Sequence, residues 1–196
     1  MSANSVTLIG IVPLFAGFIL LGFANSPLIA ISGALCINIW YVLDFVDGNV
    51  ARYRGESSVF GAFLDSFIGT LYHVFLPLSV AILLTRNSSF ASDFSAQYLS
   101  QEIWLSVAGT LVLFFCLRKI ISQKVGILIP EKRGDQAHIP LWRVVFNAID
   151  SFKAPFLLLA VIFTITDIWL WIYLVYMVIA FLGLFLKSIS NLMAIK

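Results

Sequence analysis

The chain has 196 residues, 61% of them hydrophobic and 11% charged, with a formal net charge of +2 and a mean hydropathy of +1.01. Soluble domains have about 45–50% apolar and about 25% charged residues, so a water-soluble globule of this composition would expose large apolar patches. The composition excludes soluble, disordered, collagen-like and disulfide-scaffold classes and indicates a polytopic membrane protein, with no nucleic-acid partner expected.

Six apolar segments predict six membrane-spanning helices, because one span needs about 20 apolar residues. Asn25-Ser26-Pro27 is a turn signal after the first segment, and the second continues into a polar stretch. A Ser-rich loop and a basic connection precede the fourth and fifth segments, and Thr166-Asp167 is expected to form a tight turn into the sixth. The expected fold is one all-α transmembrane domain over residues 1–196, with spans at 6–23, 28–54, 59–84, 103–121, 141–165 and 168–189.

The basic residues predict the orientation of this bundle, since short cytoplasmic loops carry an excess of Lys and Arg. With six spans, both termini lie on one side of the membrane. The opposite side carries only Arg86, and Lys153 falls inside the fifth span. We therefore expect an integral cell-membrane protein whose termini and site are cytoplasmic, on the side that carries Arg52, Arg54, Arg118, Lys119, Lys124, Lys132, Arg133, Arg143, Lys187 and Lys196.

Three aspartates at the cytoplasmic ends of spans two and three are the first candidates for chemistry, because carboxylates in a bilayer are costly. Asp44 and Asp47 are three residues apart on one helical face, and Asp65 lies on the helix that returns from the same side. Clustered carboxylates resist ionising together, and a divalent cation with oxygen ligands, such as Mg²⁺ or Mn²⁺, removes that conflict. The alternative, that they are helix caps or partners of Arg52 and Arg54, accounts less well for all three together.

The residues around these aspartates form a long, gapped motif with fixed spacings. It resembles the signature of the CDP-alcohol phosphotransferases and reads Asp44-x-x-Asp47-Gly48-x-x-Ala51-Arg52, eight residues, Gly61, three residues and Asp65. The resemblance implies a six-helix membrane enzyme, commonly a homodimer. Such an enzyme moves a phosphoalcohol from a CDP-linked donor to an acceptor and releases CMP, and a lipid product is usual.

The resemblance also implies roles for individual residues. Asp44, Asp47 and Asp65 would hold the Mg²⁺ or Mn²⁺, and Asp65 would act in catalysis. The donor would be bound near six further positions, of which the first two match the family only weakly: Asn4, Thr7, Gly48, Ala51, Arg52 and Gly61.

The sequence departs from the signature at its last position, where the family has a fourth aspartate and this chain has Gly69. In one interpretation His73, one helical turn further, supplies the missing base. In a second, the acceptor is already ionised, as a phosphate or carboxylate is, and needs no base because phosphoryl transfer depends mostly on positioning. In a third, the protein is a silent CDP-alcohol-binding partner of an active relative.

The fifth span opens with a polar stripe that is expected to face the interior, because lipid would penalise it. Arg143, Asp150 and Lys153 lie on or beside this stripe, and Arg133 precedes it. We expect these four residues to bind substrate, the arginines through forked hydrogen bonds to a phosphate. A structural ion pair and, for Asp150, a role as the base remain alternatives. The acceptor is expected to be a lipid or a polar molecule such as a glycan or phosphonate.

Overall fold

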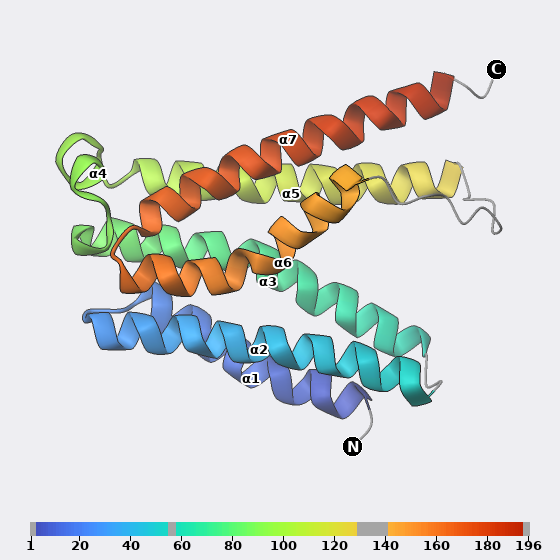
Figure 1. The fold of residues 1–196 in the computed structure, drawn as a ribbon, viewed down its shortest axis with the longest axis horizontal. Helices are drawn as coiled ribbons and strands as arrows, with labels where there is room; N and C mark the ends of the chain where they lie inside the picture. Colours follow the sequence, from blue (N-terminus) through green and yellow to red (C-terminus); the bar gives the residue numbers. More distant parts are fainter. Residues whose placement is uncertain (1–2, 55–57, 129–140, 194–196) are drawn as a thin grey trace.

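A computed structural model describes residues 3–54, 58–128 and 141–193. These residues are almost entirely helical and contain no strand, which confirms the all-α membrane fold. Successive long helices run in opposite directions, so that α1 begins and α7 ends at the same end of the bundle (Figure 1). The elements are α1 (Ala3–Gly22), α2 (Pro27–Arg54), α3 (Val59–Arg86), η1 (Ser88–Phe90), α4 (Asp93–Tyr98), α5 (Ile103–Leu128), α6 (Leu141–Ile162) and α7 (Thr166–Met193).

The protein is an integral membrane protein. Within the described residues, five helices are long and apolar enough to cross a membrane: Ser5–Gly22, Pro27–Val50, Val59–Arg86, Ile103–Val125 and Thr166–Ser190. The sixth expected span lies on α6, which is outside this set and carries Arg143, Asp150 and Lys153. α6 packs against α2 and α7. Its Lys153 side chain is 6% exposed and pairs with Asp150, so this charge has protein neighbours rather than lipid.

The turn between α6 and α7 lies earlier than the sequence predicts. α6 ends at Ile162, and Thr164 adopts a left-handed backbone with φ of 54°. The backbone N–H of Ile165 then donates to the carbonyl of Ala160 at 2.9 Å, which is the bond that closes a Schellman cap. The prediction of a turn at Thr166-Asp167 is therefore wrong: both residues belong to the first turn of α7.

Asp167 is drawn into α7 because it has partners on the preceding loop. Its carboxylate accepts hydrogen bonds from the Ser92 backbone N–H at 2.8 Å and from the Ser92 hydroxyl at 2.6 Å. Thr166 donates to the carbonyl of Phe90 at 2.8 Å. These bonds close the end of the bundle formed by residues 22–27, 86–103 and 163–166, which we call the closed end.

The helix pair α1 and α2 packs with its backbones nearly in contact. A Cβ atom added to Gly33 would lie 2.5 Å from the backbone nitrogen of Leu21, and one added to Gly17 would lie 2.9 Å from the carbonyl oxygen of Gly33. Only residues without a side chain permit this approach. It holds α1 against α2 along a line that continues towards Thr7 and Asp47.

α6 is bent near its middle, where Pro155 interrupts the helix (Figure 1). Proline lacks the N–H that would bond to the carbonyl of Ser151, and its ring clashes with that carbonyl. Neighbouring carbonyls bond to other helices instead: Trp169 Nε1 donates to Lys153 O at 3.0 Å, and Asn38 Nδ2 donates to Ala154 O at 3.1 Å. The bend is thus held from α7 and from α2.

Candidate functional site

A cavity of about 210 Å³ lies among α2, α3 and α6. We call the opposite end of the bundle, where α1 begins and α7 ends, the open end. The cavity lies between the closed end and the open end. The helices spread apart at the open end (Figure 1). The cavity is lined by Trp40, Tyr41, Asp44, Phe45, Gly69, Tyr72, His73, Asp150, Ser151 and Lys153.

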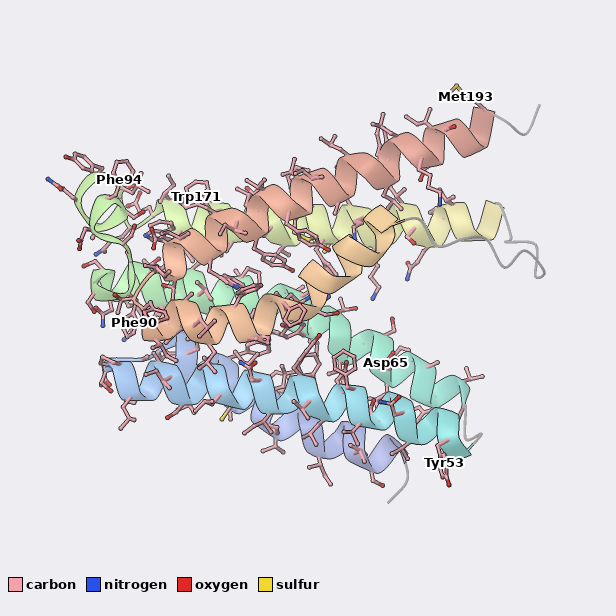
Figure 2. All side chains as sticks on the ribbon, in the orientation of Figure 1. Tyr53, Asp65, Phe90, Phe94, Trp171 and Met193 are labelled. Carbon is pink, nitrogen blue, oxygen red and sulfur yellow. The ribbon has the colours of Figure 1, made fainter. Side chains whose placement is uncertain are left out.

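In the group of Asp44, Asp47 and Asp65, here called the aspartate trio, Asp47 and Asp65 act electrostatically on Asp44, and Asp65 acts on Asp47. Asp44 lines the cavity. Asp47 is 7% exposed and accepts a hydrogen bond of 2.5 Å from the hydroxyl of Thr7 on α1. Asp65 is exposed on the half of α3 nearer the open end (Figure 2).

The trio does not form a closed metal cage. Among the described residues, no group of three or more His, Cys, Asp or Glu side chains is placed so that it could hold a metal ion. The one described ion pair, Lys153 with Asp150, involves none of the three. The metal prediction is untested by these observations and stays a prediction.

The structure describes only some of the other residues that were predicted to bind the donor or the substrate. Gly48 is half-buried beside Asp47, and Gly61 lies in the first turn of α3, where its N–H bonds to the N-cap hydroxyl of Ser58 at 2.9 Å. The side chains of four predicted residues, which sit on helical backbone, lie outside the described part: Asn4, Ala51, Arg52 and Arg143. Arg133 lies outside the described residues altogether.

Lys153 is the best-enclosed charge of the site. Its side chain is 6% exposed and pairs with Asp150, with 3.0 Å between Nζ and Oδ1. The ammonium also lies 3.2 Å from Nδ1 and 3.3 Å from Nε2 of His73, and 4.9 Å from the centre of the Tyr72 ring. Two residues predicted to bind substrate and one predicted base are therefore in direct contact around the cavity.

His73 is held from three helices. Its ring stacks on Phe115 of α5, with 4.4 Å between centroids and 18° between planes. Its Nδ1 lies 3.2 Å from the hydroxyl of Tyr173 on α7, while Lys153 approaches from α6. The predicted base is thus part of a buried polar cluster rather than a side chain free to turn.

The space beside Gly69 is open. A Cβ atom added there would have no heavy atom within 4 Å beyond its chain neighbours and the backbone of its own helical turns. Packing therefore does not require a glycine at this position, and the cavity extends to its backbone. The neighbouring Tyr72 is buried, and among the described residues its hydroxyl has no hydrogen-bond partner.

Two basic residues of α5, Arg118 and Lys119, lie near the site without lining its cavity. Lys119 donates to the Ser66 hydroxyl at 3.3 Å and to the hydroxyl of Thr70, the residues on either side of Gly69 along α3. Arg118 acts electrostatically on Asp150 and on His73. We call this pair the α5 cations.

The sequence that forms this site matches a known family. The family model of CDP-alcohol phosphatidyltransferases matches residues 1–187, nearly the full chain and all of the site. The chain belongs to the CDP-alcohol phosphatidyltransferase family. No curated protein and no solved structure matches the chain in the same comparisons. Membership makes the protein one of a family of membrane transferases of substituted phosphate groups, with a CDP-alcohol as the donor.

Sequence reasoning missed several residues that this member of the CDP-alcohol phosphatidyltransferase family places at or near the site. The α5 cations read as part of the positive-inside pattern, although Phe115 and Arg118, three residues apart, share a helical face. Tyr173 carries no signal, because a tyrosine in an apolar helix is common near membrane surfaces. Its role follows only from the packing of α7 against α3.

A second, mostly apolar cavity of about 260 Å³ lies between α6 and α7, on the side of the bend nearer the closed end. Lys153, Tyr173 and Tyr176 line one part of it, and the remaining lining residues are apolar or aromatic. Lys153 thus borders both cavities.

Proposed function

We propose that the protein transfers a phosphoalcohol group from a CDP-linked donor to an acceptor, with release of CMP and dependence on a divalent metal. The observation that carries this proposal is the match of the family model over residues 1–187, together with the aspartate trio beside an internal cavity. We place this site on the cytoplasmic face, because ten of the twelve basic residues of the sequence fall on that side of the predicted topology. A homodimer is proposed from the family alone.

The donor set of the trio suits Mg²⁺ or Mn²⁺. Three carboxylates supply hard oxygen ligands, and no described cation pairs with them. When bound, the ion would offset negative charge on the diphosphate of the donor. Asp44, Asp47 and Asp65 are proposed to hold it, and Thr7 to orient Asp47 through its hydrogen bond.

The acceptor is proposed to enter beside α6. Lys153 and Asp150 line the cavity from that helix, and Arg143 and Arg133 are proposed to add phosphate contacts. The acceptor oxygen attacks the phosphorus distal to cytidine, the bond from that phosphorus to the bridging oxygen breaks, and CMP leaves. A lipid product is proposed as the family default.

The proposal is tested with purified protein in lipid nanodiscs and a panel of donors, including CDP-diacylglycerol, CDP-glycerol and CDP-ethanolamine. We expect CMP release with at least one donor in the presence of Mg²⁺ or Mn²⁺ and its loss with a chelator. If no donor gives metal-dependent CMP release or thermal stabilisation, the transferase proposal is wrong.

A second candidate function is that of a silent partner, which binds CDP-alcohols without turnover. It is favoured by Gly69, which stands where the family signature has an aspartate. Asp65→Asn separates the two functions. In an enzyme it abolishes turnover, whereas in a silent partner, which has no turnover to lose, it only weakens donor binding. Donor affinity and CMP release, measured on the same preparation, give the answer.

A further inference from the structure

We propose that the acceptor attacks through an oxygen that is already anionic, that of a phosphate monoester, held in the open space beside Gly69. This inference rests on the proposed transferase function and names its acceptor class. It is carried by four features of the site: the space at Gly69, the buried positive charge, the unpartnered hydroxyl of Tyr72 and the engagement of His73.

The space itself is where an acceptor must lie. In this cavity Gly69 and Asp44 line the same volume, so a group beside Gly69 lies next to the aspartate trio. A carboxylate at position 69, as in the family signature, would fill part of this space and would repel an anion. Glycine removes both obstacles, and no described side chain enters in its place.

One buried cation lines this space, and two further basic residues lie near it on α5. Lys153 reaches it from α6 while 6% exposed, and Lys119 bonds to the residues that flank Gly69 along α3. Arg118 adds a third cation, within electrostatic range of Asp150. Of these three cations only Lys153 is buried, and Asp150 pairs with it. An anionic phosphate oxygen in this space would gain a charge-assisted hydrogen bond from the Lys153 ammonium, which it would share with Asp150.

Tyr72 supplies a hydrogen-bond donor without a partner. Its side chain lines the cavity, and its hydroxyl is buried with no partner among the described residues. A buried, unsatisfied hydroxyl is unfavourable, so its retention beside a cavity points to a ligand oxygen. A hydrogen bond to a charged phosphate oxygen is of the stronger class.

The ring of His73 is already engaged by its neighbours. The ammonium of Lys153 lies 3.2 and 3.3 Å from the two ring nitrogens, and the hydroxyl of Tyr173 lies 3.2 Å from Nδ1. Because the ring also stacks on Phe115, it is not free to turn towards an acceptor hydroxyl. A phosphate monoester needs no base, because its oxygen is already ionised.

The reaction balances without proton transfer. An oxygen of the acceptor phosphate attacks the distal phosphorus of the donor, a new P–O–P linkage forms, and the P–O–P linkage to cytidine breaks as CMP leaves with both bonding electrons. One phosphoanhydride replaces another, so the exchange is close to even in free energy. A carboxylate acceptor would instead give a more reactive acyl phosphate, which favours phosphate.

The test uses acceptors that differ only in the reacting group. Phosphatidic acid carries a phosphate monoester and no hydroxyl, and diacylglycerol with the same acyl chains carries the hydroxyl alone. Ethyl phosphate and ethanol make the matching soluble pair. With the nanodisc protein, Mg²⁺ and the donor panel, we expect product mass spectra to show a P–O–P-linked product with at least a tenfold preference for phosphate. The two pairs distinguish a lipid from a soluble source.

Gly69→Asp and Gly69→Asn are matched variants of nearly equal size. The aspartate is expected to lower the rate with the phosphate acceptor at least tenfold more than the asparagine does. Tyr72→Phe, which removes one unsatisfied hydroxyl, is expected to lower it about tenfold with the fold intact. Lys124→Met, at an exposed position of α5, is the control and is expected to change nothing.

Each outcome is decisive. A product formed with hydroxyl acceptors at equal or higher rate, or CMP release to water alone, overturns this inference and leaves the transferase function standing. Equal effects of Gly69→Asp and Gly69→Asn overturn it as well, since the charge would then not matter. No CMP release with any pair overturns the transferase proposal, and this inference with it.

Discussion

The closed and open ends of the bundle are built on different principles. At the closed end, α3 buries apolar residues such as Leu76, Val80 and Leu84, and Asp167 ties the loop to α7. At the open end, residues 59–67 of α3 contain no buried residue, and the helices spread apart (Figure 1). The charges that face the interior, Asp44, Asp150 and Lys153, lie between these two regions.

The closed end therefore contributes mainly to the stability of the bundle, and the residues around the cavity are the candidates for chemistry. The close approach at Gly33 and the capped turn at Thr164 hold the closed end together. Neither feature involves the ionisable residues that line the cavity. The site then occupies the place where packing becomes loose enough to admit a ligand but polar side chains still have protein neighbours. Changes at the two ends should therefore have different effects, and the following variants test this.

The largest effect is expected from Asp44→Asn at the cavity. It removes one negative charge from the trio while keeping the size of the side chain. A metal ion contributes several kcal/mol to charge stabilisation, so we expect CMP release to fall on the order of 10²–10³-fold. The melting temperature should stay near that of the parent. A rate within threefold of the parent would remove Asp44 from the site.

Gly33→Ala tests the closed end. The new Cβ would lie 2.5 Å from the Leu21 nitrogen and 2.9 Å from its Cα, so the α1 and α2 backbones must separate. Overpacking of this kind costs about 1–3 kcal/mol, and we expect a lower melting temperature in thermal unfolding of the nanodisc protein. An unchanged melting temperature would show that the α1–α2 contact is not the tight one described.

Thr7→Val tests the contact that joins α1 to the aspartate trio. The substitution keeps the shape but removes the hydroxyl that donates to Asp47. Losing a partner that orients a metal ligand lowers metal affinity about 10–100-fold, so the Mg²⁺ concentration for half-maximal CMP release should rise by that factor. At saturating Mg²⁺ the rate should recover. Failure to recover would mean that Thr7 acts on something other than metal binding.

The smallest effect is expected from Gly109→Ala in α5, the matched control for Gly33→Ala. A Cβ atom there would have no heavy atom within 4 Å beyond its chain neighbours and the backbone of its own helical turns. Alanine favours a helix over glycine by up to about 1 kcal/mol, so the melting temperature should stay level or rise slightly. A marked fall would contradict the open surroundings of this glycine.

The sequence was informative where a physical constraint is local. Apolar length predicts the helices, and Asp44 and Asp47, three apart before Asp65, indicate a site because carboxylates are rare in a bilayer. The contact of Lys153 with His73 was not predictable: the residues are 80 positions apart, and nearly uniform apolar helices reveal little of which faces meet. The roles of Arg118 and Lys119 were hidden for the same reason, and the turn after α6 was misplaced because Asp167 has partners at Ser92.

At the bend of α6, Lys153 and the next residue are bonded to three other helices. The carbonyl of Lys153 is tied to Trp169 of α7 and its ammonium reaches His73 of α3, while the next carbonyl, that of Ala154, is tied to Asn38 of α2. A rotation of α6 about its own axis would break all three contacts together. α6 is consequently held from three helices at one point, so that a substitution at Trp169, outside the polar cavity, would change the position of the charge that lines the cavity.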